Sequence, residues 1–439
     1  MSGSSIILVM ITIMLSSGVA FGAYAQSLRV MEGPTVLHAG IADQWGGHTF
    51  CYLLVGKHDV FWSATAYRAD GQLRTALVGQ HPRYGSSSTP AISVVRFDEP
   101  NVKGINQPQM IRSPDGYVHV FIGVTYTTDN PNYNVGKLRY FRSKSPEDIS
   151  ELVDRTELIP TGPYSDFHLR MNVGISPDGR RMALVILAIS EDGSVPFNTP
   201  VIFIGEKRGS DFVFQEPIKY AEPMGFFYPQ VAAASDGIVI VGEVWDNPDR
   251  SITRLLHLNW KGELLHQEDL PTDGDGTYLS YDLRPPDPMD WSRLVLYYNK
   301  TPKEHKICRH EFWEYNTQTG QLRLLRSLET EYGLSNAGKW MPLSEHSSVF
   351  INNPSMGQLH IWEGDILGGG EVAHAPLPGA NPLALGFLAS AYLFAPNPLQ
   401  GSVVVPEEIY VASDCFNPGR TPEKSGPCSF LLWRLGTQK

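Results

Sequence analysis

Apolar runs joined by short polar turns recur along the chain. The first clear case lies within Trp45–Tyr67, where the apolar runs Phe50–Val55 and Val60–Tyr67 flank the turn Gly56–Asp59. Two β-rich runs separated by a short glycine-containing turn predict a β-hairpin. Comparable stretches begin at Asn106, Leu169 and Phe227. The turn glycines of the four copies are 60, 63 and 58 residues apart, at Gly56, Gly116, Gly179 and Gly237.

Three weaker copies complete the series, near Asp290, Glu345 and Gly401. Seven copies of roughly 55–63 residues predict an all-β fold, a seven-bladed β-propeller with four antiparallel strands in each blade. A propeller closes by joining its two ends, so we expect the segment Thr35–Ala39 and the C-terminal run Ser429–Gly436 to share a blade. No linker-like change of composition interrupts the pattern, which predicts a single domain over residues 26–439.

The N-terminal segment has a different pattern. Residues 6–23 are nearly all apolar or small, and Ala23-Tyr24-Ala25 is a small-x-small cleavage pattern before Gln26. These features predict a signal peptide over residues 1–25, cleaved after Ala25, and a secreted or periplasmic protein. The alternative is a membrane anchor, which needs about 20 apolar residues and flanking charges. We expect no membrane association after cleavage.

The charge balance narrows the possible partners. The formal net charge is −11. Of the 439 residues, 42% are hydrophobic and 18% are charged, so the chain has enough apolar residues to form a large core. No basic stripe is present, which argues against a nucleic-acid partner. An anionic substrate must therefore be recognised by a few placed cations. We expect a monomer.

The cysteines and histidines suggest two structural features. Cys415 and Cys428 bracket a loop rich in Pro, Gly and Ser, which predicts a disulfide in an oxidising compartment. His305, Cys308 and His310 are candidate ligands of a structural metal site, with zinc the best match and calcium the other possibility. The alternative is a set of surface histidines beside a buried cysteine. We expect no cofactor to be required for activity.

The innermost strand of each blade lines the central channel of a propeller, and its first residues open onto one face. Counting back from each turn places polar or aromatic residues at these positions: His48, Asn106, Gln107, Arg170, Asn172, Tyr228, Tyr281 and Asn336. We predict that they meet around one funnel. The alternative is that they fill the channel and satisfy the backbone of loops.

The residue types at this funnel favour one chemistry. Arginine suits a carboxylate or sulfate, and His and Tyr carry protons. Carboxylates are scarce there, whereas a conventional glycosidase needs two. The set therefore predicts β-elimination on a uronate, in which His48, Tyr228 or Tyr281 moves protons. Arg170 stabilises the developing charge with Asn172 and Gln107 beside it.

Further side chains are candidates for substrate contact. His168 precedes Arg170 by two residues, so the two share a face of an extended strand. Tyr126 lies beside a long loop and is placed to rim the cleft, and His119 is either a binding residue or a satisfied internal histidine.

Four motifs resemble a known group of propellers: Trp45–His48, Asp115–Val120, Leu138–Ser143 and Ser145–Ile149. Their order is similar to that of the BNR-repeat-like seven-bladed propeller superfamily, which includes ulvan lyases and α-L-rhamnosidase-like enzymes. The resemblance covers residues 40–250 best and implies a carbohydrate-active enzyme. The family's lyases use two histidines, a tyrosine and an arginine. The two histidine positions fall here at Ile105 or Asn106 and at Thr125 or Tyr126, and the tyrosine position falls near Arg170. His48 matches a histidine at the mouth of the first blade.

The leading hypothesis is a secreted polysaccharide lyase acting on a uronic-acid-containing polysaccharide or oligosaccharide. The first alternative is a glycoside hydrolase, rhamnosidase-like or sialidase-like, on the same propeller. The second is a propeller that binds glycans without turnover. A quinone-dependent dehydrogenase would need a cofactor motif that the sequence does not display.

Overall fold

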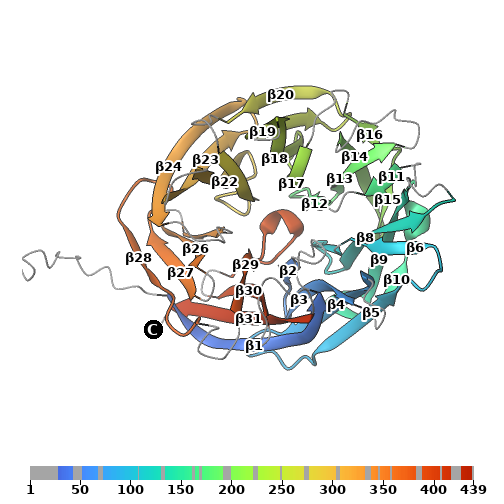
Figure 1. The fold of residues 1–439 in the computed structure, drawn as a ribbon, viewed down its shortest axis with the longest axis horizontal. Helices are drawn as coiled ribbons and strands as arrows, with labels where there is room; N and C mark the ends of the chain where they lie inside the picture. Colours follow the sequence, from blue (N-terminus) through green and yellow to red (C-terminus); the bar gives the residue numbers. More distant parts are fainter. Residues whose placement is uncertain are drawn as a thin grey trace, which may run out of the picture.

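Seven antiparallel blades surround a central axis in the computed structural model (Figure 1), which confirms the predicted fold class. The structure describes residues 28–42, 52–67, 73–106, 108–129, 134–160, 164–167, 171–190, 199–220, 226–247, 250–270, 276–302, 307–331, 338–344, 347–355, 358–381, 388–405, 408–416 and 427–437. Among these residues, no helix is long and apolar enough to cross a bilayer.

The blades are numbered I–VII in chain order, and each runs from its innermost strand outward. Blade I comprises β2 (Tyr52–Val55), β3 (Asp59–Tyr67), β4 (Leu73–Pro82) and β5 (Ala91–Arg96). Blade II comprises β6 (Val102–Ile105) and β7 (Gln109–Arg112), then β8 (Val118–Thr127), β9 (Asn134–Ser145) and β10 (Asp148–Asp154). Blade III comprises β11 (Tyr164–Phe167) and β12 (Asn172–Ile175), then β13 (Arg181–Ser190), β14 (Thr199–Arg208), β15 (Asp211–Phe214) and β16 (Ile218–Lys219).

Blade IV comprises β17 (Phe226–Ala233), β18 (Gly237–Asn247), β19 (Arg250–Asn259) and β20 (Leu264–Asp269). Blade V comprises β21 (Gly276–Arg284), β22 (Arg293–Pro302), β23 (Ile307–Asn316) and β24 (Gln321–Glu331). Blade VI comprises β25 (Gly338–Ser344), β26 (Ser347–Ser355), β27 (Gln358–Gly364) and β28 (Val372–Pro376). Blade VII comprises β29 (Leu388–Phe394), β30 (Ile409–Phe416) and β31 (Pro427–Thr437), with β1 (Leu28–Ala42) outermost.

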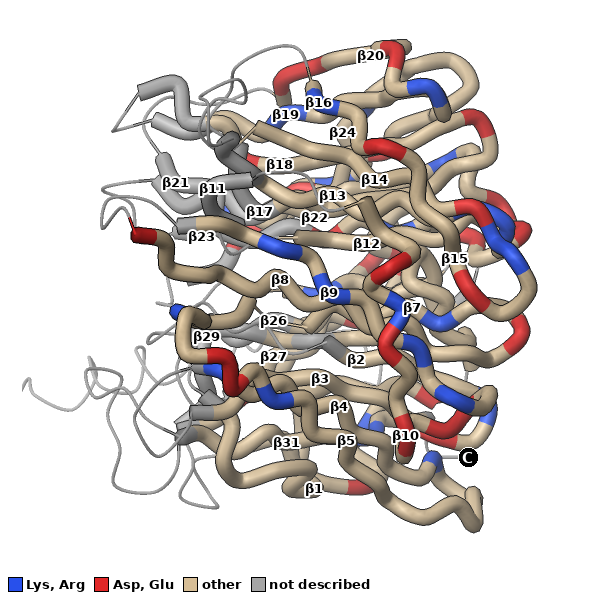
Figure 2. Tube along the Cα trace, turned by 90° about the vertical axis from the view of Figure 1, so that its right-hand side faces the viewer, with Lys and Arg blue, Asp and Glu red and all other residues tan. Residues whose placement is uncertain are grey.

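Tight turns join the first two strands of several blades on one face of the ring, called here the turn face. In blade II, Gly116 has φ +92° and its amide donates to the carbonyl of Ser113 at 2.8 Å. Blade III repeats this geometry, with Gly179 at φ +66° donating to Ser176 at 2.8 Å. A positive φ favours glycine because other residues meet steric strain there. Figure 2 shows charged residues of both signs along this face.

The ring closes through strand pairing between the two ends of the chain. β1 runs antiparallel to β31 from the pair Leu28–Thr437 to the pair Ala42–Pro427, and Thr35 lies opposite Leu432. The predicted sharing of a blade by the N-terminal and C-terminal segments is confirmed. A cleavage after Ala25 would leave β1 complete.

Successive side chains of a strand point toward different neighbouring blades, and this alternation contradicts the predicted disulfide. Cys415 packs with Val411 and Leu431 in the core shared with blade VI, whereas Cys428 packs with Phe430 in the core shared with blade I. Cys428 lies opposite Phe416, one residue away from Cys415. The two buried thiols are therefore on opposite faces of the blade and are not joined as a disulfide.

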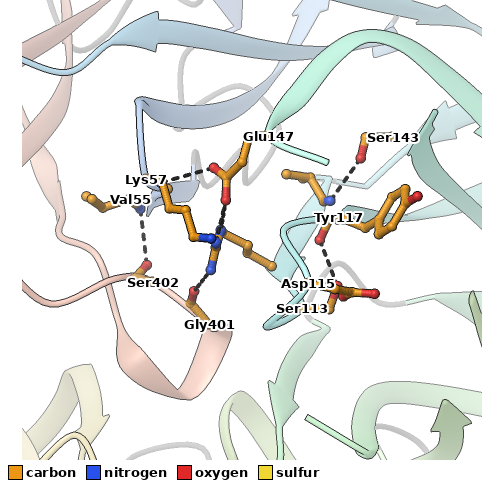
Figure 3. A network of polar contacts seen from close by, with 12 residues as sticks. Val55, Lys57, Ser113, Asp115, Tyr117, Ser143, Glu147, Gly401 and Ser402 are labelled. Atoms are coloured by element: carbon orange, nitrogen blue, oxygen red, sulfur yellow. Dashed lines mark hydrogen bonds and ion pairs between the residues drawn. The ribbon is translucent and has the colours of Figure 1, made fainter. Parts of the chain in front are cut away.

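The connection between β29 and β30 is much longer than a hairpin turn and crosses the centre of the ring (Figure 1). Its residues 395–405, called here the plug, contain the short 3₁₀ helix η3 (Pro398–Gln400). The plug hydrogen-bonds to three blades where their innermost strands end. Val403 donates to the Val55 carbonyl at 2.8 Å, and the side chain of Asn397 donates to the Leu283 carbonyl at 2.9 Å. Arg112 of blade II donates to Gly401, and Figure 3 shows this contact beside the one between Val55 and Ser402. The plug thus covers the turn-face end of the central channel.

Candidate functional site

Six of the predicted site residues lie outside the described part of the chain. These are His48, Gln107, His168, Arg170, His305 and Asn336. Tyr228, Tyr281 and Cys308 lie in β17, β21 and β23, but their side chains are not described. Their roles therefore stay predictions.

Two predicted amide residues are described, and both are buried. Asn106 lies between β6 and β7 and is 5% exposed; its backbone amide donates to the Gly123 carbonyl at 2.7 Å. A Cβ at Gly123 would lie 3.0 Å from the Asn106 side-chain nitrogen, so this amide packs over the second strand of its own blade. Asn172 begins β12 opposite Val185 and is 4% exposed. Asn172 therefore lies in an innermost strand and Asn106 lies beside one, and their contact with a substrate stays a prediction.

His119 lies in a closed network between blades II and III and is fully buried. Its Nδ1 lies 2.7 Å from the Tyr140 hydroxyl, and its Nε2 lies 3.2 Å from Oγ of Ser113. The Tyr140 hydroxyl accepts the Phe212 amide, and the Ser113 hydroxyl donates to the Tyr117 carbonyl. These partners assign the Nε2–H tautomer, with Nδ1 as the acceptor. Burial lowers the pKa of His119 to about 3, so this side chain is a neutral internal histidine.

His310 has a similar environment between blades V and VI. It is fully buried, and its Nδ1 lies 3.0 Å from the Tyr297 hydroxyl. Its ring stacks on Tyr297 and contacts Phe350, and burial lowers its pKa to about 3. Among the described residues, no group of three ligating side chains is placed to hold a metal ion. Of the predicted ligands, His310 is the one whose side chain is described, and it serves this apolar core.

Tyr126 lies near the end of β8, opposite Val102 and Val135. It is partly buried, and the ammonium of Lys137 lies 5.2 Å from its ring centre. A cation over an aromatic face gains a modest electrostatic attraction. The predicted place of Tyr126 at the rim of a cleft stays a prediction.

Three charged side chains on neighbouring innermost strands form a cluster that the sequence reasoning missed. Arg284 and Asp282 lie on β21, and Lys339 lies on β25; we call them the channel cluster. Nε of Arg284 donates to Oδ2 of Asp282 at 2.6 Å, and both side chains are 2–3% exposed. Nζ of Lys339 lies 3.7 Å from Oδ1 of Asp282, and its side chain is 18% exposed.

The plug fixes one end of this cluster. The guanidinium of Arg284 donates to the carbonyls of Pro396 and Ala395, the latter at 3.1 Å. Asp282 also accepts the Trp340 amide at 3.4 Å. Burial lowers the pKa of Lys339, and Asp282 partly opposes this shift. Lys339 thus adds a second, partly exposed cation beside the Asp282–Arg284 pair.

A lysine within a short innermost strand was the available sequence signal for this cluster. Lys339 stands in the run Gly338–Ser344, next to Trp340 and Met341, both of which are buried. The alternation of side chains along one strand does not predict that Lys339 lies near Asp282, because Asp282 belongs to another blade.

No protein-family model and no curated protein sequence matches the chain. Solved structures with a similar architecture include a protein of unknown function from Dyadobacter fermentans, with 12% identity, 94% of this chain and 100% of that chain covered, and a TM-score of 0.49. The K499G mutant of NanB sialidase from Streptococcus pneumoniae is 8% identical and has a TM-score of 0.44. The match covers 92% of this chain and 71% of the sialidase chain. An α-L-arabinanase from Penicillium chrysogenum is 12% identical and has a TM-score of 0.40. The match covers 76% of this chain and 94% of the arabinanase chain. These likenesses assign no activity to the chain.

Proposed function

We propose that this protein is a secreted carbohydrate-active enzyme that cleaves a uronic-acid-containing glycan by β-elimination in the central channel. The observation that carries the proposal is the channel cluster. Lys339 supplies a partly accessible cation on an innermost strand, and the plug covers the turn-face end of the same channel. An anionic sugar would then reach the channel from the face where the innermost strands begin.

Neutralisation of the uronate carboxylate is the step that this cation supports. When a nearby cation offsets the carboxylate charge, the C5 proton becomes more acidic. A base removes that proton, the electrons of the C5–H bond form the C4–C5 double bond, and the C4–O bond breaks as its oxygen is protonated. His48, Tyr228 and Tyr281 are the proposed proton carriers, and Arg170 is a second proposed donor to the developing charge.

Hydrolysis is the second candidate, and Asp282 is the observation in its favour. It is a carboxylate on an innermost strand, and glycoside hydrolysis uses carboxylates as acid, base or nucleophile. Nε of Arg284 donates to it at 2.6 Å, so this carboxylate is already paired with a cation. A hydrolase would need a second carboxyl group across the cleft.

The decisive experiment follows two products at once. The full-length secreted protein is incubated with uronate-bearing polysaccharides and with a neutral polysaccharide, and ultraviolet absorbance is recorded beside reducing-end release. Elimination gives an unsaturated, absorbing product together with new reducing ends. Reducing ends without absorbance identify hydrolysis, and binding without either product identifies a non-catalytic propeller.

A pair of histidine variants tests the proposed site residues. We expect His48→Ala to reduce turnover by at least about 100-fold, the usual range for loss of an acid–base group. His58→Ala is the matched control, because His58 is an exposed residue of the first hairpin turn. Equal activity of the two variants would remove His48 from the mechanism.

A further inference from the structure

We infer that His360 and His374 form a binding site for a divalent transition-metal ion, with Cu²⁺ the best match, on the outer strands of blade VI. His360 lies on β27 and His374 on β28, the two outermost strands of that blade. The site is therefore separate from the central channel and does not depend on the proposed function. It has two protein ligands, and water fills the remaining coordination positions of the ion.

The strand register brings the two imidazoles together. His374 lies directly opposite Trp362, and His360 precedes Trp362 by two residues. Residues two apart on a strand share a face, and diagonal neighbours across an antiparallel pair are within reach of each other when their side chains are long. His360 and His374 therefore meet on the face of the blade where Trp362 packs into the core between blades V and VI.

The distance between the facing nitrogens fits a chelate. Nδ1 of His360 and Nε2 of His374 are 3.0 Å apart. Two imidazole nitrogens at this separation, each about 2.0–2.1 Å from one ion, subtend an angle of about 91–97° at that ion. Adjacent positions of a square-planar or tetragonal complex are about 90° apart, which favours Cu²⁺ or Ni²⁺ over tetrahedral Zn²⁺. Of these ions, Cu²⁺ binds nitrogen ligands most tightly.

Both facing nitrogens can offer a lone pair to the ion. In the hydrogen-bonded pair, one of them carries a proton and the other accepts it. The outer nitrogens, Nε2 of His360 and Nδ1 of His374, make no hydrogen bond within the described part of the chain, and no carboxylate there pairs with either ring. When the ion binds, the shared proton moves to the outer nitrogen of the ring that carries it. Two neutral imidazoles then coordinate the ion, and no proton is released.

Trp362 holds one ligand in place, and the other can adjust. The ring of His374 stacks on Trp362, with the ring centres 3.8 Å apart and the planes at 11°. His360 contacts one aromatic ring among the described residues, that of His374, at 5.1 Å. Rotation of the His360 ring directs its lone pair toward the ion, because the last torsion of a histidine side chain is broad. His374 is exposed and His360 partly buried, so the ion reaches the pair from solvent.

The test measures binding of the metal ion alone. Cu²⁺ is titrated into the full-length protein in a calorimeter, and electron paramagnetic resonance records the nitrogen ligands at one equivalent. His374→Phe keeps a ring that stacks on Trp362 but removes the ligand nitrogen. It should weaken Cu²⁺ binding at least about tenfold, because loss of even an outer partner of a metal ligand costs about 10- to 100-fold in affinity. His360→Ala should weaken binding by a similar factor.

His266→Ala is the matched control. His266 also lies on an outermost strand, β20 of blade IV, but its Nε2 faces Glu268 at 3.2 Å instead of a second imidazole. Its replacement should leave the affinity for Cu²⁺ unchanged.

A measurement without mutation keeps the inference testable if a variant fails to fold. Cu²⁺ should protect His360 and His374 of the unmutated protein from a histidine-modifying reagent, as mapped by mass spectrometry. Unchanged Cu²⁺ affinity in His374→Phe and His360→Ala, a resonance spectrum identical in the variants and the unmutated protein, or absence of protection would each overturn the site.

Discussion

Arg112 and Glu147 form a nearly enclosed ion pair on the turn face, where blade I, blade II and the plug meet (Figure 3). Nε of Arg112 donates to Oε1 of Glu147 at 2.7 Å, and Nη2 donates to the same oxygen. The other carboxylate oxygen accepts the Lys57 amide of blade I at 3.1 Å. Among the described non-glycine residues, Glu147 is the one with a positive φ, at 56°. The backbone thus adopts a strained conformation that places this carboxylate over Arg112.

Loss of the Glu147 charge is expected to be costly for stability. Glu147→Gln should lower the free energy of unfolding by about 3 kcal/mol, because Arg112 keeps its charge while only 5% exposed. Glu151→Gln is the control, since its pair with Lys144 is about 60% exposed on both sides and is worth less than about 1 kcal/mol. Chemical unfolding of the two variants measures the difference. Equal losses would show that the Arg112 pair has no special weight.

Gly401 is expected to tolerate no side chain. It has φ +79°, and an added Cβ would lie 1.7 Å from the carbonyl oxygen of Arg112, so the plug would have to move. Gly401→Ala should cost about 2–4 kcal/mol, and faster proteolysis within the plug should accompany the loss. Gly209→Ala has a similar φ of +62° with open space around it, and should cost only about 1 kcal/mol. A small effect at both glycines would contradict the tight seating of the plug.

The two internal histidines predict a loss of stability in acid. Each has a pKa of about 3 in the folded protein and 6.5 when exposed, so below pH 6.5 the unfolded chain binds protons that the folded chain does not. The free energy of unfolding should fall with decreasing pH between about 6.5 and 3, by about 1.4 kcal/mol per pH unit for each histidine. His119→Gln should make this slope shallower by about that amount between pH 6 and 5. Parallel curves for the two proteins would refute the assignment of His119 as a neutral group.

Both cysteines of blade VII should react as thiols. After unfolding without a reductant, an alkylating reagent should modify Cys415 and Cys428, because they face different interblade cores. Before unfolding, burial should protect both residues. A peptide map that shows the two residues cross-linked would contradict the strand register.

The repeat was predictable because its turns impose a local requirement on the sequence. Gly116 and Gly179 adopt positive φ values within short turns, and buried strands flank them, so the pattern is visible within a few residues. The copy around Gly401 was found as well, but its expected turn is the plug instead of a hairpin. The length of the connection between β29 and β30 does not by itself predict that this segment crosses the channel.

The candidate site was less predictable because its contacts join blades that are distant in sequence. The proximity of Lys339 to Asp282 depends on two neighbouring blades, and no local pattern encodes it. The disulfide prediction was wrong for a related reason. The loop between Cys415 and Cys428 is compatible with closure, but the register of β30 and β31 decides which face each side chain occupies.

The pairing of β1 with β31 also constrains the order in which this protein can mature. During synthesis β1 emerges long before β31, the strand with which it pairs, since Leu28 lies opposite Thr437. β1 must therefore wait until β31 has been made before it can pair, and closure of the ring joins two segments that are very distant in the sequence.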